Sequence, residues 1–92
     1  MNKDVRELHK TIDFGFQAEA FLQSDVGKYL IAKAEAEVVE ATEALKVVDP
    51  TVPDAIRELQ NRVYRGESIQ YWLAEAIQSG LNAQQEFIDQ SS

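Results

Sequence analysis

The sequence predicts an all-α protein built around an antiparallel pair of long helices. Two segments of about 25 residues repeat apolar side chains at alternating spacings of four and three, which places them on one face of a helix. A short segment with two prolines, KVVDPTVPDA, separates the two. Because so short a connection cannot return the chain to the start of the first helix, the second helix must run back along the first.

The first long helix is expected from Ser24 to Val48. Its apolar face consists of Gly27, Ile31, Ala34, Val38, Ala41, Leu45 and Val48. Alanine, glutamate and lysine fill most of the other positions, and all three residue types favour helix. Ser24 is the expected N-cap, and the carboxylate of Asp25 complements the positive end of the helix.

The connection between the two helices is expected to be a tight turn. Asp49 is disfavoured in helical conformation because it precedes Pro50, and Pro50 itself cannot continue the first helix. Thr51 and Asp54 have the spacing of a capping arrangement for the second helix. Pro53 is tolerated there, because amides of the first turn have no partner within the helix.

The second long helix is expected from about Val52 to Ser79, with Gly80 as its C-terminal stop. Its apolar face consists of Ile56, Leu59, Val63, Gly66, Gln70, Leu73 and Ile77. Residues 24–80 therefore form a helical hairpin within a single domain that spans residues 1–92.

The two ends of the chain carry weaker patterns. In the N-terminal segment, residues 1–23, Val5, Leu8 and Ile12 predict a short amphipathic helix. Gly15 in DFGF is expected to break that helix. The C-terminal tail, residues 81–92, is expected either to fray or to form a last short helix.

Apolar side chains outside the two predicted faces indicate self-association. They form further rows at helical spacing, namely Tyr29, Ala32, Ala36 and Val39 on the first helix and Ile69, Trp72 and Ala76 on the second. Burying one large apolar side chain contributes about 1.5–3 kcal/mol, so exposed rows would forgo stability and favour aggregation. The N-terminal segment can cover only part of them, and we therefore expect a helical homo-oligomer.

Composition and charge narrow the possible functions. The chain has no cysteine, which excludes disulfides and thiolate metal sites. Its apolar runs are too short to span a membrane. The formal net charge of −7 argues against a partner made of duplex nucleic acid. His9 is the only histidine, and no nucleophile, phosphate-loop or zinc motif occurs, so we expect neither an enzyme nor a cofactor.

The stretch RELQNRVYRG, residues 57–66, gathers three arginines on this acidic chain. Arg57 and Arg62 each have a carboxylate at ion-pairing distance on the same helix, from Asp54 and Glu58 respectively. Arg65 has no carboxylate three or four residues away in either direction. An unpaired arginine of this kind can bind phosphate oxygens, although a contact between subunits would also explain it.

Other residues could complete a binding site around Arg65. Asn61 shares its helix face and adds an amide. Lys28 and Lys33 form a smaller cationic group on the first long helix. Phe14, Phe16 and Phe21 could offer faces for stacking, or could belong to the core.

The hairpin resembles that of the phage cyclic-nucleotide sponges, the small anti-CBASS proteins with a relative among the anti-Thoeris proteins. The resemblance covers about residues 29–80 and rests on KAEAE, VDPTVP, AIRELQN and a WLAE run that leads to a glycine. It implies a homo-oligomer, typically a hexamer, that binds cyclic di- and trinucleotides between subunits without cleaving them. Host effectors then stay inactive, and the protein acts in the cytoplasm of the infected bacterium.

The resemblance also implies which residue types bind the ligand. The family uses an N-terminal aromatic residue, a lysine of the first long helix and an arginine of the second. The matching residues here are Phe14, Phe16 or Phe21 for the aromatic residue, Lys28 or Lys33 for the lysine, and Arg62 or Arg65 for the arginine. A phenylalanine departs from a tyrosine that could also form a hydrogen bond, which bears on ligand preference.

Two functions of other classes remain open. A non-enzymatic helical-bundle adaptor that binds another protein would explain the apolar rows, but it gives no use to Arg65 and Asn61. An acidic inhibitor that mimics DNA would use the negative charge. Its carboxylates would have to recur at phosphate-like spacing, and Glu35, Glu37, Glu40 and Glu43 are few and close together for that role.

Overall fold

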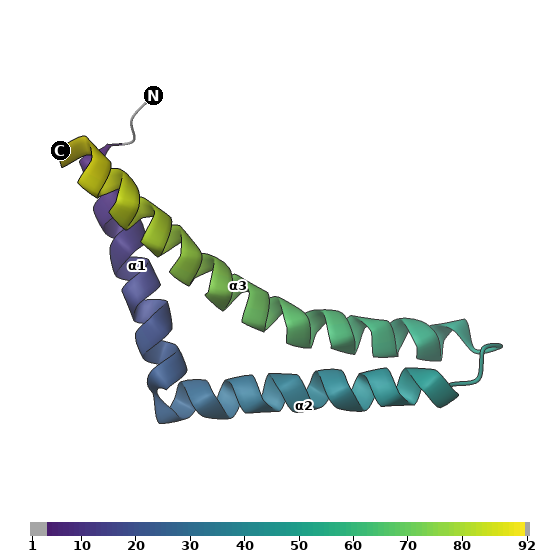
Figure 1. Cartoon of the computed structure of the whole chain (residues 1–92). Helices are drawn as coiled ribbons and strands as arrows, with labels where there is room; N and C mark the ends of the chain where they lie inside the picture. The colour runs from purple at the N-terminus through teal and green to yellow at the C-terminus, as the bar shows by residue number, and fades with distance from the viewer. Residues whose placement is uncertain (1–3, 92) are drawn as a thin grey trace.

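The computed structural model describes residues 4–91, which form three α-helices. α1 spans Val5–Gln23, α2 spans Asp25–Val47 and α3 spans Pro53–Ser91. α1 and α2 meet at a sharp corner, and the long, bent α3 runs back along both of them (Figure 1). α2 lies along the N-terminal part of α3, and α1 lies along its C-terminal part. The prediction of an all-α chain is confirmed for these residues.

The three helices form a thin body. Its principal extents are 61, 33 and 15 Å, and its radius of gyration is 18.4 Å. A compact domain of this length has a radius of gyration of about 12 Å. The smallest extent is little more than the thickness of one helix with its side chains, which is about 10–12 Å. Each helix therefore covers its neighbour on one side only.

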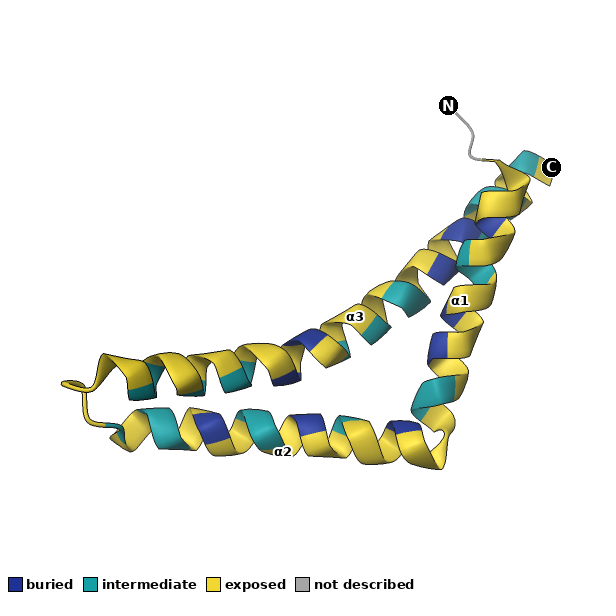
Figure 2. Cartoon of the chain, turned by 180° about the vertical axis from the view of Figure 1, so that it is seen from behind, coloured by how far each residue is buried: buried dark blue, intermediate teal, exposed yellow. Residues whose placement is uncertain are grey.

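The core of this thin body follows the two predicted apolar faces. All residues of both faces are buried or half-buried, and Ala34, Ala41 and Gly66 are among the buried ones. Buried residues lie on the inner sides of the helices, whereas the outer sides are exposed (Figure 2). Among the described residues, Leu8 is the only large side chain that is completely buried. The single chain thus encloses little apolar surface.

The predicted break at Gly15 is wrong. α1 is one continuous helix of 19 residues, and Gly15 lies inside it, buried against α3. A Cβ atom on Gly15 would lie 3.0 Å from the Cα atom of Gly80 and 3.1 Å from the carbonyl oxygen of Ala76. Gly15 therefore permits two helix backbones to approach closely. Residues 1–3 of the predicted N-terminal segment lie outside the described residues.

The predicted stop at Gly80 is wrong for the same reason. α3 continues through Gly80 to Ser91, so the predicted separate tail belongs to this helix, except for residue 92, which lies outside the described residues. A Cβ atom on Gly80 would lie 3.0 Å from the Cα atom of Gly15. Nearby, the ring centroids of His9 and Phe87 are 5.1 Å apart. Contact with α1 thus supports the C-terminal part of α3.

Ser24 forms the corner between α1 and α2. Its hydroxyl accepts a hydrogen bond from the backbone amide of Gly27 at 2.9 Å and donates one to the carbonyl of Phe21 at 2.6 Å. The prediction that Ser24 is the N-cap is confirmed. A Cβ atom on Gly27 would overlap the carbonyl oxygen of Phe21, so the corner requires glycine at this position.

Asp49 organises the turn between α2 and α3. Its carboxylate accepts hydrogen bonds from the hydroxyl of Thr51 at 2.7 Å and from the Thr51 amide at 2.8 Å. These two bonds lower the pKa of Asp49, because they favour its charged form. The predicted capping role of Thr51 is wrong, since its hydroxyl binds Asp49 instead. Pro53 lies in the first turn of its helix, as predicted, and α3 begins at Pro53, one residue after the predicted start at about Val52.

Candidate functional site

Three cations gather around one carboxylate on a face shared by α2 and α3. Arg62 of α3 donates a hydrogen bond from its Nε to an oxygen of Glu37 of α2 at 2.7 Å, and its Nη2 lies 3.4 Å from Glu40. The positive charges of Arg65 and Lys33 also act on Glu37. We call Lys33, Arg62 and Arg65 the cationic cluster.

The hydrogen bond between Arg62 and Glu37 favours the charged forms of both groups. The hydrogen bond from Arg62 lowers the pKa of Glu37 below its ordinary value, and the charges of Arg62, Arg65 and Lys33 act in the same direction, while partial burial opposes them. The same hydrogen bond raises the pKa of Arg62. Glu37 is therefore an anion at neutral pH, held among three positive side chains.

The arginines of the stretch 57–66 differ in their ion pairs. Arg57 pairs with Asp54 at 3.6 Å on the surface, as the sequence predicted. The predicted pair between Arg62 and Glu58 is wrong, because Arg62 reaches across to α2 instead. Within residues 4–91, Arg65 takes part in no ion pair. Arg65 is thus the arginine of this stretch whose donors are open to a ligand.

An apolar surface adjoins the cationic cluster along α3. Ile69 and Trp72 follow Arg65 by four and seven residues, so the three share one face of the helix. Arg65 and Trp72 are separated by two turns, or about 10 Å along the axis. On this side α1 and α3 enclose an open hollow of about 430 Å³, lined by Phe14, Gln17, Ala18, Phe21, Ile69, Trp72, Leu73 and Ala76. We call it the aromatic hollow.

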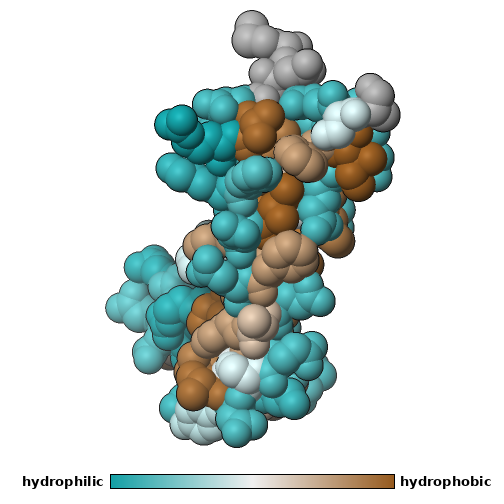
Figure 3. All heavy atoms as spheres, turned by 90° about the vertical axis from the view of Figure 1, so that its left-hand side faces the viewer, coloured by the Kyte–Doolittle hydropathy of each residue, from teal (hydrophilic) through white to brown (hydrophobic). Residues whose placement is uncertain are grey.

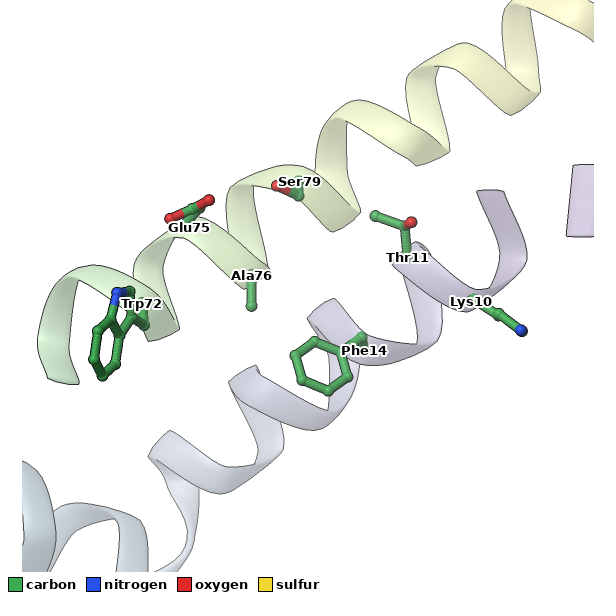
Figure 4. A pocket seen from close by; sticks show the side chains of 7 residues that line it. All are labelled: Lys10, Thr11, Phe14, Trp72, Glu75, Ala76 and Ser79. Carbon is green, nitrogen blue, oxygen red and sulfur yellow. The ribbon is translucent and has the colours of Figure 1, made fainter. Parts of the chain in front are cut away.

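Phe14 and Trp72 also border a second opening between α1 and α3. It has a volume of about 510 Å³ and is lined by Lys10, Thr11, Phe14, Trp72, Glu75, Ala76 and Ser79. The two rings project from facing helices with Ala76 between them, and the amino group of Lys10 points away (Figure 4). Phe14 is 63% exposed and Trp72 is 61% exposed, so both rings can accept a stacked planar partner.

A tyrosine lies beside the cationic cluster on α2. The amino group of Lys33 is 6.0 Å from the ring centroid of Tyr29, at the outer limit of a cation–π contact. Tyr29 is exposed. The cationic cluster therefore has an exposed aromatic ring on α2 and the aromatic hollow further along α3.

The remaining predicted site residues lie elsewhere or at the margin. Phe16 lines a narrow crevice beside the contact of Gly15 and Gly80. Lys28 is exposed and precedes Lys33 by five residues, so the two project from different sides of α2. Asn61 is exposed one turn before Arg65 on α3. Of the predicted residues, Arg62 thus contacts Glu37, and Lys33 and Arg65 lie near enough for their charges to act on it.

Three residues of this face, Tyr29, Glu37 and Trp72, are not among the site residues that the sequence predicts. The sequence predicts Tyr29 and Trp72 only as members of apolar rows, although the spacing of seven between Arg65 and Trp72 puts these two residues on one helix face. For Glu37 the sequence predicts only a place on an acidic surface, because its position beside Arg62 depends on the register between α2 and α3. No group of side chains among residues 4–91 could hold a metal ion, and no helix there is long and apolar enough to cross a membrane.

In comparisons with models of protein families, with curated proteins and with solved structures, no match to this chain is significant.

Proposed function

We propose that this chain binds cyclic di- and trinucleotides and holds them without cleaving them, as a phage anti-defence protein that prevents the activation of CBASS-type effectors in the cytoplasm of the host. The observation that carries the proposal is the cationic cluster beside exposed aromatic rings on an otherwise acidic chain. A cyclic nucleotide carries two or three phosphates, so a few cations suffice to bind it. The resemblance of residues 29–80 to the phage sponges points to the same ligand class.

Each part of the face has a role in this proposal. Arg65 and Lys33 receive phosphate oxygens, because Arg65 makes no ion pair within the described residues and Lys33 is exposed. Phe14 and Trp72 supply stacking faces for the bases, and base stacking on aromatic side chains contributes about 1–3 kcal/mol per base. In the ligand-free chain Arg62 is largely engaged by Glu37 and Glu40, so there it holds α2 against α3.

We further propose that the chain works as a homo-oligomer, with six subunits as the resemblance implies. Large apolar side chains remain exposed on all three helices, among them Phe14, Tyr29, Val39, Tyr64 and Trp72. Hydrophobic residues form a band down one side of the molecule between hydrophilic margins (Figure 3). A body only 15 Å thick cannot enclose them within one chain. Contacts between subunits would bury them and would close the open hollows into pockets.

The proposal is tested by calorimetric titration of the protein with a panel of cyclic di- and trinucleotides and linear controls, followed by denaturation and identification of the released ligand. Recovery of intact ligand after tight binding is expected. Recovery of cleaved ligand would identify an enzyme instead. Absence of binding across the panel would contradict the proposal.

Arg65→Ala gives the residue-level prediction. We expect affinity for the bound cyclic nucleotide to fall about tenfold or more, because a hydrogen bond to a charged group contributes about 1.5–3 kcal/mol. Size-exclusion chromatography should show an unchanged assembly. Lys46→Ala is the matched control, because Lys46 is an exposed cation at the far end of α2 that pairs only with Glu43 at 3.0 Å in the described structure. Equal affinity in both variants would remove Arg65 from the site.

A helical-bundle adaptor or an acidic inhibitor that binds another protein is the second candidate, and the exposed apolar side chains favour it. The dependence of binding on salt concentration distinguishes the two functions. Nucleotide binding at the cationic cluster should weaken as ionic strength rises, whereas association through an apolar interface should not.

A further inference from the structure

The cationic cluster already holds an anion of its own. Glu37 accepts the 2.7 Å hydrogen bond from Arg62 and lies within the field of Lys33 and Arg65. Its side chain is 39% exposed, whereas that of Glu40 is 72% exposed and reaches Arg62 only at 3.4 Å. Glu37 is therefore the more enclosed of the two carboxylates, and it faces cations from both helices.

We propose that Glu37 is a specificity-determining residue that competes with ligand phosphate for Lys33, Arg62 and Arg65, so that the site rejects small anions and retains ligands that combine several phosphates with bases. This inference rests on the proposed function and adds a selection rule to it. A carboxylate and a phosphate seek the same N–H donors. An incoming phosphate must therefore displace Glu37 from Arg62 or bind beside its negative charge.

Either route makes a lone phosphate group a poor ligand. Repulsion between unit charges at contact distance is about 1 kcal/mol in water and rises as the surroundings become less polar. A ligand without bases has only its attraction to the cations to offset this cost. A cyclic nucleotide can offset it, because its bases can stack on Tyr29 or in the aromatic hollow while a phosphate reaches Arg65. Small phosphate compounds in a cell would then bind too weakly to occupy the site.

The charge of Glu37 can be separated from its structural contact. Glu37→Gln has nearly the same shape, and its amide oxygen can still accept the hydrogen bond from Arg62. The substitution thus keeps a link between α2 and α3 while it removes the negative charge from the cationic cluster. Glu43→Gln is the matched control, because it makes the same chemical change on α2 at an exposed carboxylate that pairs with Lys46.

The experiment titrates inorganic pyrophosphate and, separately, cyclic di-AMP into the full chain and into the two variants. Heats of binding give the affinities, and the NMR signals of the arginine Nε–H groups report occupation of the cationic cluster. We expect Glu37→Gln to bind pyrophosphate about tenfold more tightly than the unchanged chain, and Glu43→Gln to stay within about twofold. The preference for cyclic di-AMP over pyrophosphate should narrow in Glu37→Gln, because pyrophosphate carries more charge.

Unchanged or weaker pyrophosphate binding by Glu37→Gln, with helical circular dichroism intact, would overturn the inference. Glu40→Gln provides a second variant in case Glu37→Gln does not fold, and it should raise pyrophosphate affinity in the same direction by a smaller factor. No increase in either variant would also overturn it. Failure of cyclic di-AMP and the wider nucleotide panel to bind the unchanged chain would contradict the proposed function, while the pyrophosphate comparison would still decide the role of Glu37.

Discussion

α3 packs against two partners in different ways. Along α2 the contact consists of the two buried or half-buried apolar faces, one close approach at Gly66 and the ion pair between Arg62 and Glu37. Along α1 the two backbones come together at a pair of glycines, Gly15 and Gly80. Each contact therefore has a glycine at its closest approach, and the α2 contact also has an ion pair between the helices.

A substitution at the corner between α1 and α2 should have the largest effect on the free energy of unfolding. In Gly27→Ala the new methyl group would overlap the carbonyl oxygen of Phe21 and would come 3.0 Å from the hydroxyl of Ser24. We expect a loss of about 3 kcal/mol or more in the free energy of unfolding, measured by urea denaturation followed by circular dichroism. The exposed neighbour substitution Lys28→Ala should change it by less than about 0.5 kcal/mol. Similar stability for both variants would contradict this account of the corner.

The two glycine contacts with α3 can be compared directly. A Cβ atom at Gly66 would lie 2.6 Å from a methyl carbon of Val38 and 2.8 Å from the carbonyl oxygen of Ala34, whereas one at Gly80 meets nothing closer than 3.0 Å. We expect Gly66→Ala to cost about 2 kcal/mol. Gly80→Ala should be closer to neutral, because alanine regains about 1 kcal/mol of helix propensity. A larger loss for Gly80→Ala in urea denaturation would reverse the comparison.

Removal of the ion pair between α2 and α3 should have a smaller effect on the free energy of unfolding. Arg62→Gln removes the contacts with Glu37 and Glu40, and we expect a loss of about 1 kcal/mol, because the pair is only partly exposed. Arg65→Gln is the control on the same helix, one turn away and outside any ion pair of the described residues, and it should be nearly neutral in stability. Equal losses in thermal unfolding would show that the cross-helix pair contributes nothing measurable.

The smallest expected effect is the dependence of the unfolding free energy on pH through Glu37. The pKa of Glu37 lies below 4.5 in the folded chain, so the ionised form stabilises the fold. This contribution is fully present above the unfolded pKa and is lost as the pH falls through the lowered, folded value. The difference in unfolding free energy between the unchanged chain and Glu37→Gln should thus shrink below about pH 4.5. Asp49 titrates in both proteins and cancels. A difference that grows in acid would contradict the assignment.

The α2 contact was predictable because its signal repeats along the sequence. Each apolar face recurs over several turns, so one ambiguous residue such as Gln70 does not hide it. The closest approach of α1 to α3 depends on two single glycines, and a glycine has the same appearance in a sequence whether it ends a helix or lets another helix approach. Gly15 and Gly80 were therefore assigned to helix ends, and the continuity of α1 and α3 was missed.

The candidate site was predictable only in part, for a related reason. Local spacing singled out Arg65, because the absence of a nearby carboxylate can be seen along one helix. The same spacing along one helix predicted Glu58 as the partner of Arg62, whereas the partner is Glu37 on another helix. The register between α2 and α3 decides that choice. The sequence names Lys28 and Lys33 as equal candidates, because only this register places Lys33 near Arg62 and Arg65.

The position of α1 on the far part of α3 has a consequence for the order of folding. α2 and α3 are joined by residues 48–52, so they close on each other over a short stretch of chain, whereas α1 must meet residues near the opposite end. Contacts that close short loops form sooner, because less chain entropy is lost before they form. We therefore expect α2 and α3 to pair first and α1 to dock last, with pulsed hydrogen exchange as the measurement. A newly made chain would then present the cationic cluster before the aromatic hollow exists.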